Sequence, residues 1–282
     1  MAISADIVKK LRDKTGAGMM DCKKALVEAE GDFQKAEKLL KELGLAAAAK
    51  REGRATNEGR IFTSVAATRA AIVEMACETD FVARNENFIA LGNSIAEDIV
   101  TRGVTESDEA IEAKVKEAIS TIKENMTVRR IELLDVSENE LVADYIHGDG
   151  GSIGVLVKLS LESAAMKDHA LVRQFAFDCA LHVAAFNPVF LSVDTVAPSY
   201  LEEQESIFKK QAENMDKPEH VIQGIIKGKM KKHLAEICLV DQPFVKDDKK
   251  SVAAVAEAVG KEAGGTVRVS DYRYFRVGQE TE

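Results

Sequence analysis

Two places in the sequence carry side chains that could take part in chemistry. Cys77, Glu78 and Asp80 follow an apolar stretch, and His147 precedes a run of glycines. A cysteine with carboxylates could hold a metal ion, and a cysteine with a histidine could form an activated nucleophile. Alternation along a strand puts Cys77 and Glu78 on opposite faces, and no further ligand lies nearby in the sequence. An enzyme that uses Cys77 or His147 is therefore kept only as an alternative.

Two glycine-containing stretches fail as nucleotide-binding loops. Residues 16–18 lack a third glycine and a preceding strand, and residues 224–229 are one residue short, with Met230 where Ser or Thr is needed. The cysteines and histidines show no spacing typical of metal sites or disulfide frameworks. His182 lies among apolar residues and is expected in the core or half-buried. We expect no cofactor, no metal ion and four buried, reduced thiols: Cys22, Cys77, Cys179 and Cys238.

The composition is that of a folded protein with an aliphatic core. The chain has 282 residues, of which 46% are hydrophobic and 30% are charged, and it contains no tryptophan. Its formal net charge of −9 argues against general nucleic-acid binding, which depends on Lys and Arg. Residues 1–6 have no basic stretch leading into an apolar one, and no apolar run approaches the length of a membrane span. We expect a cytoplasmic protein with no direct contact to nucleic acid or membrane.

The first 45 residues predict a separate module of three short helices. Ser4 is expected to cap the first helix and Gly16 to end it, and Asp32 is expected to cap the third helix, with Gly44 as its end. Such a small bundle is marginal by itself and suits a docking role. Residues 46–60 are alanine-rich, then basic, and are interpreted as a linker.

The pattern of the residues after the linker predicts two α+β units of the same plan, each an antiparallel sheet with helices on one face. We assign the first to residues 61–138 and the second to residues 139–277, with a tail at 278–282. The second unit carries an insertion at about 188–240, in which residues 200–215 and 218–234 predict a helical hairpin. Its exposed apolar edges suggest a surface for a partner or for self-association. The expected strands are 61–65, 70–77, 127–136, 141–147, 152–161 and 266–277, and the expected helices are 87–101, 108–125, 164–186 and 251–263.

The pair Asp80-Phe81 is unusual because an acid and a large aromatic residue stand side by side where a strand should end. The simplest interpretation is a helix N-cap at Thr79-Asp80 with Phe81 packed into the core as a staple. The sequence leaves open whether Asp80 acts as a cap or through its charge. It also leaves open whether Phe81 faces the core or solvent.

Four segments resemble signature segments of the bacterial elongation factor Ts family, in the same order along the chain. They are TGAGMMDCKKAL at 15–26, ETDFVARN at 78–85, HGDGGSIGVLV at 147–157 and DQPFV at 241–245. The resemblance implies a guanine nucleotide exchange factor, not an enzyme, for the translation GTPase elongation factor Tu. Such a factor binds the GDP complex, displaces Mg²⁺, promotes GDP release and leaves when GTP binds. It also implies an N-terminal module similar to ubiquitin-associated domains, two related core subdomains and a homodimer through the helical hairpin.

The resemblance also implies site residues. The segment Thr79, Asp80, Phe81 and Val82 would insert near the Mg²⁺ and phosphate site of the GTPase, with Phe81 as a wedge. Further contacts would come from the helical module and from the second subdomain: Leu11, Arg12, Met19, Met20 and His147. The glycine turn after His147 is longer than is usual in the family. A helical adaptor that binds a partner without changing nucleotide exchange is the other alternative.

Overall fold

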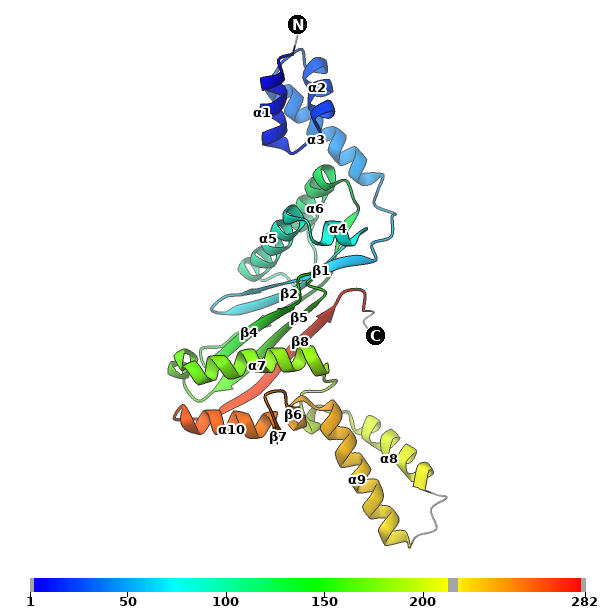
Figure 1. The fold of residues 1–282 in the computed structure, drawn as a ribbon, viewed down its shortest axis with the longest axis vertical. Coiled ribbons are helices and arrows are strands. Elements are labelled where there is room, and N and C mark those ends of the chain that lie inside the picture. The colour runs from blue at the N-terminus through cyan, green and yellow to red at the C-terminus, as the bar shows by residue number, and fades with distance from the viewer. Residues whose placement is uncertain (1–2, 213–217, 280–282) are drawn as a thin grey trace. The chain divides into compact units, whose positions relative to one another are not determined.

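The computed structural model describes residues 3–212 and 218–279 (Figure 1). Helices and antiparallel sheets form an α+β fold, which is the class that the sequence predicts. The described residues fall into two compact units. The first contains residues up to Leu134, Ile146–Gly154 and the segment from Phe275, and the second contains Asp135–Tyr145 and Val155–Tyr274.

The first unit begins with three helices, α1 (Ala5–Thr15), α2 (Met19–Glu28) and α3 (Phe33–Ala49). Three of the predicted helix ends, at Ser4, Gly16 and Asp32, are confirmed. The Ile7 N–H donates to Ser4 Oγ at 3.4 Å, and Gly16 ends α1 in the left-handed conformation. The Lys35 N–H donates to Asp32 Oδ1 at 3.0 Å. Leu11 and Leu26 are fully buried between the helices.

The prediction that Gly44 ends the third helix is wrong, because α3 continues to Ala49. The residues after Gly44 are leucine and alanines, which are strong helix formers. Gly44 instead permits a close approach to helix α6 (Glu109–Ile122). A Cβ atom at residue 44 would lie 2.5 Å from the Cβ of Ser120. The glycine is therefore a packing residue inside a helix.

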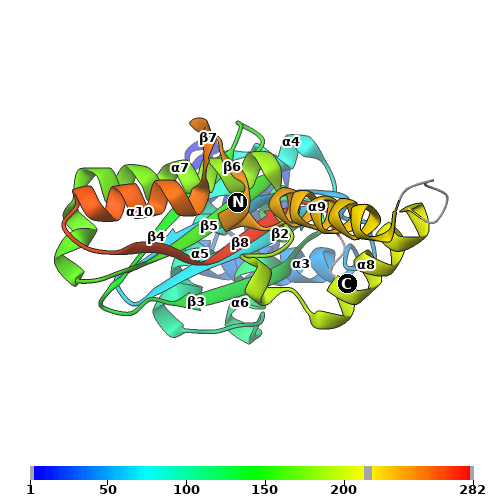
Figure 2. The same ribbon diagram turned by 90° about the horizontal axis from the view of Figure 1, so that it is seen from below.

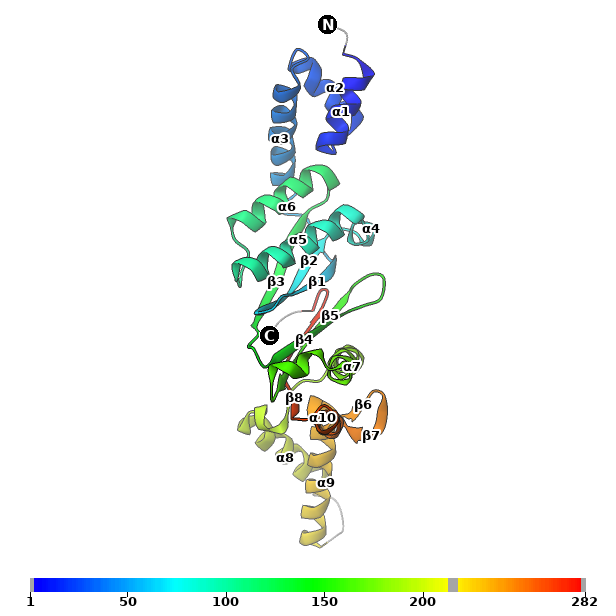
Figure 3. The same ribbon diagram turned by 90° about the vertical axis from the view of Figure 1, so that its left-hand side faces the viewer.

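Strands β1 (Glu58–Val65), β2 (Arg69–Cys77) and β3 (Met126–Asp135) form the sheet of the first unit in the order β1-β2-β3. β1 and β2 pair antiparallel from Glu58 opposite Cys77 to Val65 opposite Ala70. Helix α5 (Glu86–Arg102) packs on β1 and β2, and α6 packs on α5 (Figure 3). All five elements lie within three residues of their predicted bounds.

A buried carboxylate ties the central strand β2 to β3. Glu74 has no exposed surface, and its oxygens pair with Arg129 at 3.2 Å and with Arg130 at 2.6 Å. The Gly278 N–H also donates to Glu74 at 2.9 Å. A buried charge is tolerated only when it is paired and hydrogen-bonded. These three donors therefore hold β2 to β3 and to the segment at Gly278.

The second sheet has the order β4-β5-β8, and helices α7 and α10 lie side by side on one of its faces (Figure 2). Two further helices, α8 and α9, pack against each other, and a short hairpin is formed by β6 and β7. The bounds are β4 (Glu140–His147), β5 (Ile153–Leu161), α7 (Ala170–Phe186), η2 (Val193–Thr195), α8 (Pro198–Ala212), α9 (Glu219–Ile237), η3 (Leu239–Asp241), β6 (Pro243–Phe244), β7 (Asp247–Ser251), α10 (Val252–Glu262) and β8 (Val267–Arg276).

The single helix expected at 164–186 is two elements. A 3₁₀ turn, η1 (Ala164–Asp168), precedes α7, and the extended backbone of His169 separates them. Met166 is buried, so the turn is anchored on its own before the helix starts. In the predicted hairpin, the end of the first helix at residues 213–215 lies outside the described residues. No described helix is long and apolar enough to cross a membrane.

His182 is a core residue, as predicted. It is fully buried, and its Nε2 lies 2.8 Å from Gln242 Oε1. Its Nδ1 accepts the Val245 N–H at 3.2 Å. Both ring nitrogens are thus used by a neutral imidazole, which donates to Gln242 and accepts from Val245. Burial lowers the pKa of His182, because the charged form loses its hydration.

Replacing Gly44 by alanine should destabilise the packing of α3 on α6. Alanine favours a helix over glycine by about 1 kcal/mol, but overpacking costs about 1–3 kcal/mol. We expect a net loss of protection in α3 and α6, measured by amide hydrogen exchange. Adding Ser120→Gly removes the clashing Cβ and should restore protection. Unchanged protection in Gly44→Ala alone would contradict the close approach.

His182 should make the folded state less stable as the pH falls below about 7. The lowered pKa of His182 means that the unfolded chain takes up a proton below the ordinary value of 6.5 while the folded chain resists it. Stability from this group is therefore present above pH 6.5 and lost toward the folded-state pKa. The measurement is the difference in Tm between pH 7.5 and 5.5. The fall in Tm from pH 7.5 to 5.5 should be smaller in His182→Gln than in wild type. In the exposed-site control His220→Gln it should be as large as in wild type.

Candidate partner-binding site

The turn that carries Asp80 and Phe81 follows β2 directly. It forms a single helical turn, α4 (Asp80–Ala83), which is too short to be stable by itself. Thr79 is its N-cap, and Thr79 Oγ1 accepts the Val82 N–H at 3.4 Å. Val82 and Ala83 are buried in the hydrophobic cluster of the first unit. The turn is therefore held at both ends.

Phe81 points into solvent. Its side chain is 82% exposed, the highest value among the large hydrophobic side chains of the described residues. The prediction of an N-cap is confirmed at Thr79, but the prediction that Phe81 packs into the core as a staple is wrong. Burying a phenylalanine is worth about 1.5–3 kcal/mol. A side chain that leaves this energy unused in the free protein is available to release it on contact with a partner.

Asp80 is not the cap of α4. It occupies the first position inside the helix, and its side chain is exposed. It makes no hydrogen bond or ion pair to any residue that the structure describes. The capping oxygen belongs to Thr79, so the local structure does not require a carboxylate at residue 80. What Asp80 offers to a partner is its negative charge.

The corner between α6 and β3 braces this turn. Glu124 accepts the Thr79 N–H at 3.0 Å and the Thr79 hydroxyl at 2.7 Å. In the reverse direction, Glu78 accepts the Asn125 N–H at 2.6 Å. The side chain of Asn125 donates to the carbonyl of Arg54 at 2.8 Å. Three stretches of chain meet here in one polar network.

The predicted contacts of the helical module divide into exposed and buried residues. Met19 and Met20 are 43% and 63% exposed at the start of α2, and Arg12 is exposed on α1. Leu11 is fully buried in the module core, so its side chain supports the module from inside and offers no surface to a partner. Asp21, next to the methionines, pairs with Lys123 at 3.3 Å.

His147 is exposed at the end of β4, and the glycine turn after it contacts β1. Arg60 donates to the carbonyl of Asp149 at 2.7 Å, and the Ile61 N–H donates to that of Gly151 at 2.8 Å. Gly151 has a φ of 60° and faces the Arg60 side chain closely, so this position favours glycine. The turn that looks longer than usual in the sequence is thus well anchored.

The structure does not support chemistry at Cys77. The Cys77 thiol is buried and donates to the carbonyl of Thr79 at 3.2 Å. Burial raises its pKa to about 12, so the reactive thiolate is absent at neutral pH. All four cysteines are buried and unpaired by disulfides, as predicted. Among the residues that the structure describes, no group of three or more His, Cys, Asp or Glu side chains is placed to hold a metal ion.

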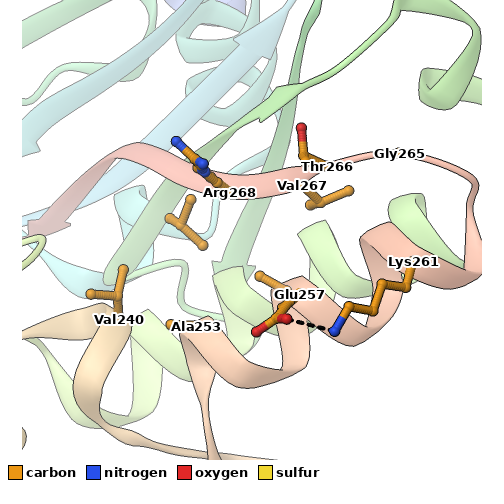
Figure 4. Close-up of a pocket in the computed structure, with 10 residues that line it drawn as sticks. Val240, Ala253, Glu257, Lys261, Gly265, Thr266, Val267 and Arg268 are labelled. Carbon is orange, nitrogen blue, oxygen red and sulfur yellow. Dashed lines mark hydrogen bonds and ion pairs between the residues drawn. The ribbon is translucent and has the colours of Figure 1, made fainter.

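A cavity of about 560 Å³ lies in the second unit between α10 and β8 (Figure 4). Its wall is largely aliphatic, and Lys261 pairs with Glu257 at 2.6 Å along the helix. None of the described residues that line it is a cysteine or a histidine. The cavity therefore offers little to a reacting substrate, and the turn at Phe81 remains the stronger candidate site.

Sequence reasoning missed the bracing residues Glu124 and Asn125. They lie about 45 positions from Thr79 and Glu78 in the chain, and no local pattern connects them. The sequence carries no signal for them, because the predicted helix at 108–125 includes both residues, whereas α6 ends at Ile122 and Lys123 adopts a positive φ of 68°. A residue pair of this kind becomes visible only when the strand order of the sheet is known.

Comparisons with known proteins agree with the resemblance in the sequence. The family model described as "Elongation factor TS" matches residues 78–279. Elongation factor Ts of Borrelia recurrentis is 48% identical over 278 residues, covering 99% of this chain and 100% of that protein. The protein of the same name from Borreliella burgdorferi is 46% identical over 276 residues, covering 98% and 99%. That of Treponema denticola is 44% identical over 278 residues, covering 99% of each chain. The chain belongs to the elongation factor Ts family.

Proposed function

We propose that this chain is the guanine nucleotide exchange factor of elongation factor Tu in translation elongation. It binds the GDP complex, dislodges Mg²⁺, promotes GDP release and dissociates when GTP enters. Family membership supports the place in translation elongation. The observation that carries the mechanism is Phe81, which is 82% exposed on a turn that the rest of the unit holds in place.

The mechanism is a coupling of two binding equilibria and needs no covalent step. If the factor weakens GDP binding to its partner, GDP must weaken binding of the factor by the same ratio. A weakening of about 10⁴-fold requires about 5.5 kcal/mol of differential binding. Phe81 alone supplies about 1.5–3 kcal/mol. Other contacts must provide the remainder.

The structure offers suitable surfaces for those contacts. Phe81 acts as the wedge at the phosphate side of the partner, and the charge of Asp80 acts on the neighbouring backbone and Mg²⁺ environment. Met19, Met20 and Arg12 extend the contact from the helical module, and methionine suits an interface that must adapt. His147 contacts another domain of the partner. Leu11 contributes indirectly by holding the module together, and Thr79 and Val82 do the same for the turn.

The finer organisation is also part of this proposal. Residues 1–45 form a module similar to ubiquitin-associated domains, 46–60 a linker, and 61–138 and 139–277 two related subdomains, with a tail at 278–282. The hairpin within about 188–240 makes a homodimer; Ile207 on α8 is 38% exposed and available for such a contact. The factor works in the cytoplasm, where its partner carries aminoacyl-tRNA, and has no direct contact with nucleic acid.

Phe81→Ala should slow GDP release at limiting factor concentration by roughly 10- to 100-fold, the loss expected for one buried phenylalanine. The measurement is the release of a fluorescent GDP analogue from purified elongation factor Tu. Phe186→Ala is a matched control, because Phe186 is also exposed, at 54%, but lies on α7. Equal rates for wild type and Phe81→Ala would remove the wedge from the mechanism. Stable binding without any acceleration by wild type would favour the adaptor.

Asp80→Asn and Asp80→Ala should slow exchange to a similar extent, within about twofold. An asparagine can replace an aspartate as a helix cap but not as a charge. Because Thr79 already caps α4, only the charge of residue 80 should matter. Both variants should change stability by less than about 0.5 kcal/mol, as expected for an exposed site. Full activity in Asp80→Asn with loss in Asp80→Ala would restore a capping role to this residue.

A further inference from the structure

The cap of α4 is a capping box whose two halves come from different parts of the chain. In an ordinary capping box, the N-cap side chain accepts the N–H of the third helical residue, and a Glu or Gln at that third position accepts the N–H of the N-cap. Here Thr79 accepts the Val82 N–H at 3.4 Å. The side chain of Val82 is apolar, however, and cannot accept the Thr79 N–H. Glu124, 45 positions away, accepts the Thr79 N–H at 3.0 Å instead.

The identity of residue 82 explains why the second half must come from elsewhere. Val82 is only 9% exposed and belongs to the hydrophobic cluster of the first unit. A glutamate at this position would have to bury its carboxylate among apolar side chains, which is strongly unfavourable. The turn needs both an apolar anchor at residue 82 and an acceptor for the Thr79 N–H. A carboxylate from the α6–β3 corner satisfies both requirements.

Glu124 also sets the direction of the Thr79 hydroxyl. The hydroxyl hydrogen is directed to Glu124 Oε1 at 2.7 Å, which leaves a lone pair of the same oxygen for the Val82 N–H. Hydrogen bonds to a carboxylate are stronger than neutral ones, and chains of hydrogen bonds reinforce each other. The carboxylate therefore stabilises the whole first turn of α4, including the backbone of Phe81.

We propose that Glu124 is a positioning residue for partner binding. By completing the cap of α4 from the neighbouring α6–β3 corner, it keeps Phe81 exposed and oriented before the partner arrives. The inference rests on the proposed function of the turn in nucleotide exchange. Without Glu124, only the buried Val82 and Ala83 hold the turn in the free protein, and the cost of ordering its start on binding lowers the affinity.

The test compares wild type with Glu124→Gln and Glu124→Ala in the GDP-release assay over a range of factor concentrations. The concentration for half-maximal stimulation should rise about tenfold in Glu124→Ala and less in Glu124→Gln, while the maximal rate stays within about twofold, because the Phe81 wedge itself is intact. Glu117→Gln is the control, because Glu117 is an exposed glutamate on α6, the helix that ends just before Glu124. Equal half-maximal concentrations for wild type and Glu124→Ala would overturn the proposal.

A local readout separates positioning from a general loss of stability. Hydrogen exchange in Glu124→Ala should increase at residues 79–83 and stay unchanged in α1 and α10. Thr79→Val, which removes the hydroxyl, should reproduce the defect, whereas Thr79→Ser, which keeps it, should not. A uniform increase of exchange throughout the first unit would assign Glu124 to general stability and reject positioning.

A double-mutant cycle with Phe81→Ala separates this inference from the proposed function. If Glu124 acts by presenting Phe81, Glu124→Ala should have little further effect once the ring is absent. Additive losses would reject the positioning role while the exchange function stands. If wild type does not accelerate GDP release at all, the proposed function fails, and a role of Glu124 in that function fails with it.

Discussion

Phe81 can stay exposed because the residues on both sides of it are fixed. Thr79 is held through its N–H and its hydroxyl by Glu124, and Val82 and Ala83 are buried in the core. A phenylalanine on a flexible loop would fold back onto the nearest apolar surface, because burial is favourable by about 1.5–3 kcal/mol. Fixing the flanking backbone prevents this collapse. The exposed ring is thus a property of the whole strand-to-helix junction.

The junction in turn depends on the order of the strands. β2 ends at Cys77, and its neighbour β3 begins at Met126. In an antiparallel sheet the end of one strand lies beside the start of the next, so the turn after β2 meets the corner before β3. The buried ion pairs of Glu74 with Arg129 and Arg130 fix β2 against β3. A shift in that pairing would separate Glu124 from Thr79.

Local sequence signals predict much of this fold and only part of the site. Ser4, Gly16 and Asp32 mark helix ends, because caps depend on a few neighbouring residues. Gly44 misleads the same reasoning, since its role is set by Ser120 on another helix. Thr79 is recognisable as a cap, but the exposure of Phe81 depends on tertiary packing. The Glu124 brace depends on strand order, which no local pattern encodes.

Helix α6 connects the turn at Phe81 with the helical module. A Cβ at Gly16 would lie 2.8 Å from the Thr121 side chain, and a Cβ at Gly44 would lie 2.5 Å from that of Ser120. Lys123 pairs with Asp21 beside the exposed methionines, and the next residue is Glu124. One helix end therefore supports Met19, Met20 and Phe81 together. When several modest contacts are carried on one support, the first contact raises the effective concentration of the others. This is how small surfaces can reach the several kcal/mol that the proposed displacement of a nucleotide demands.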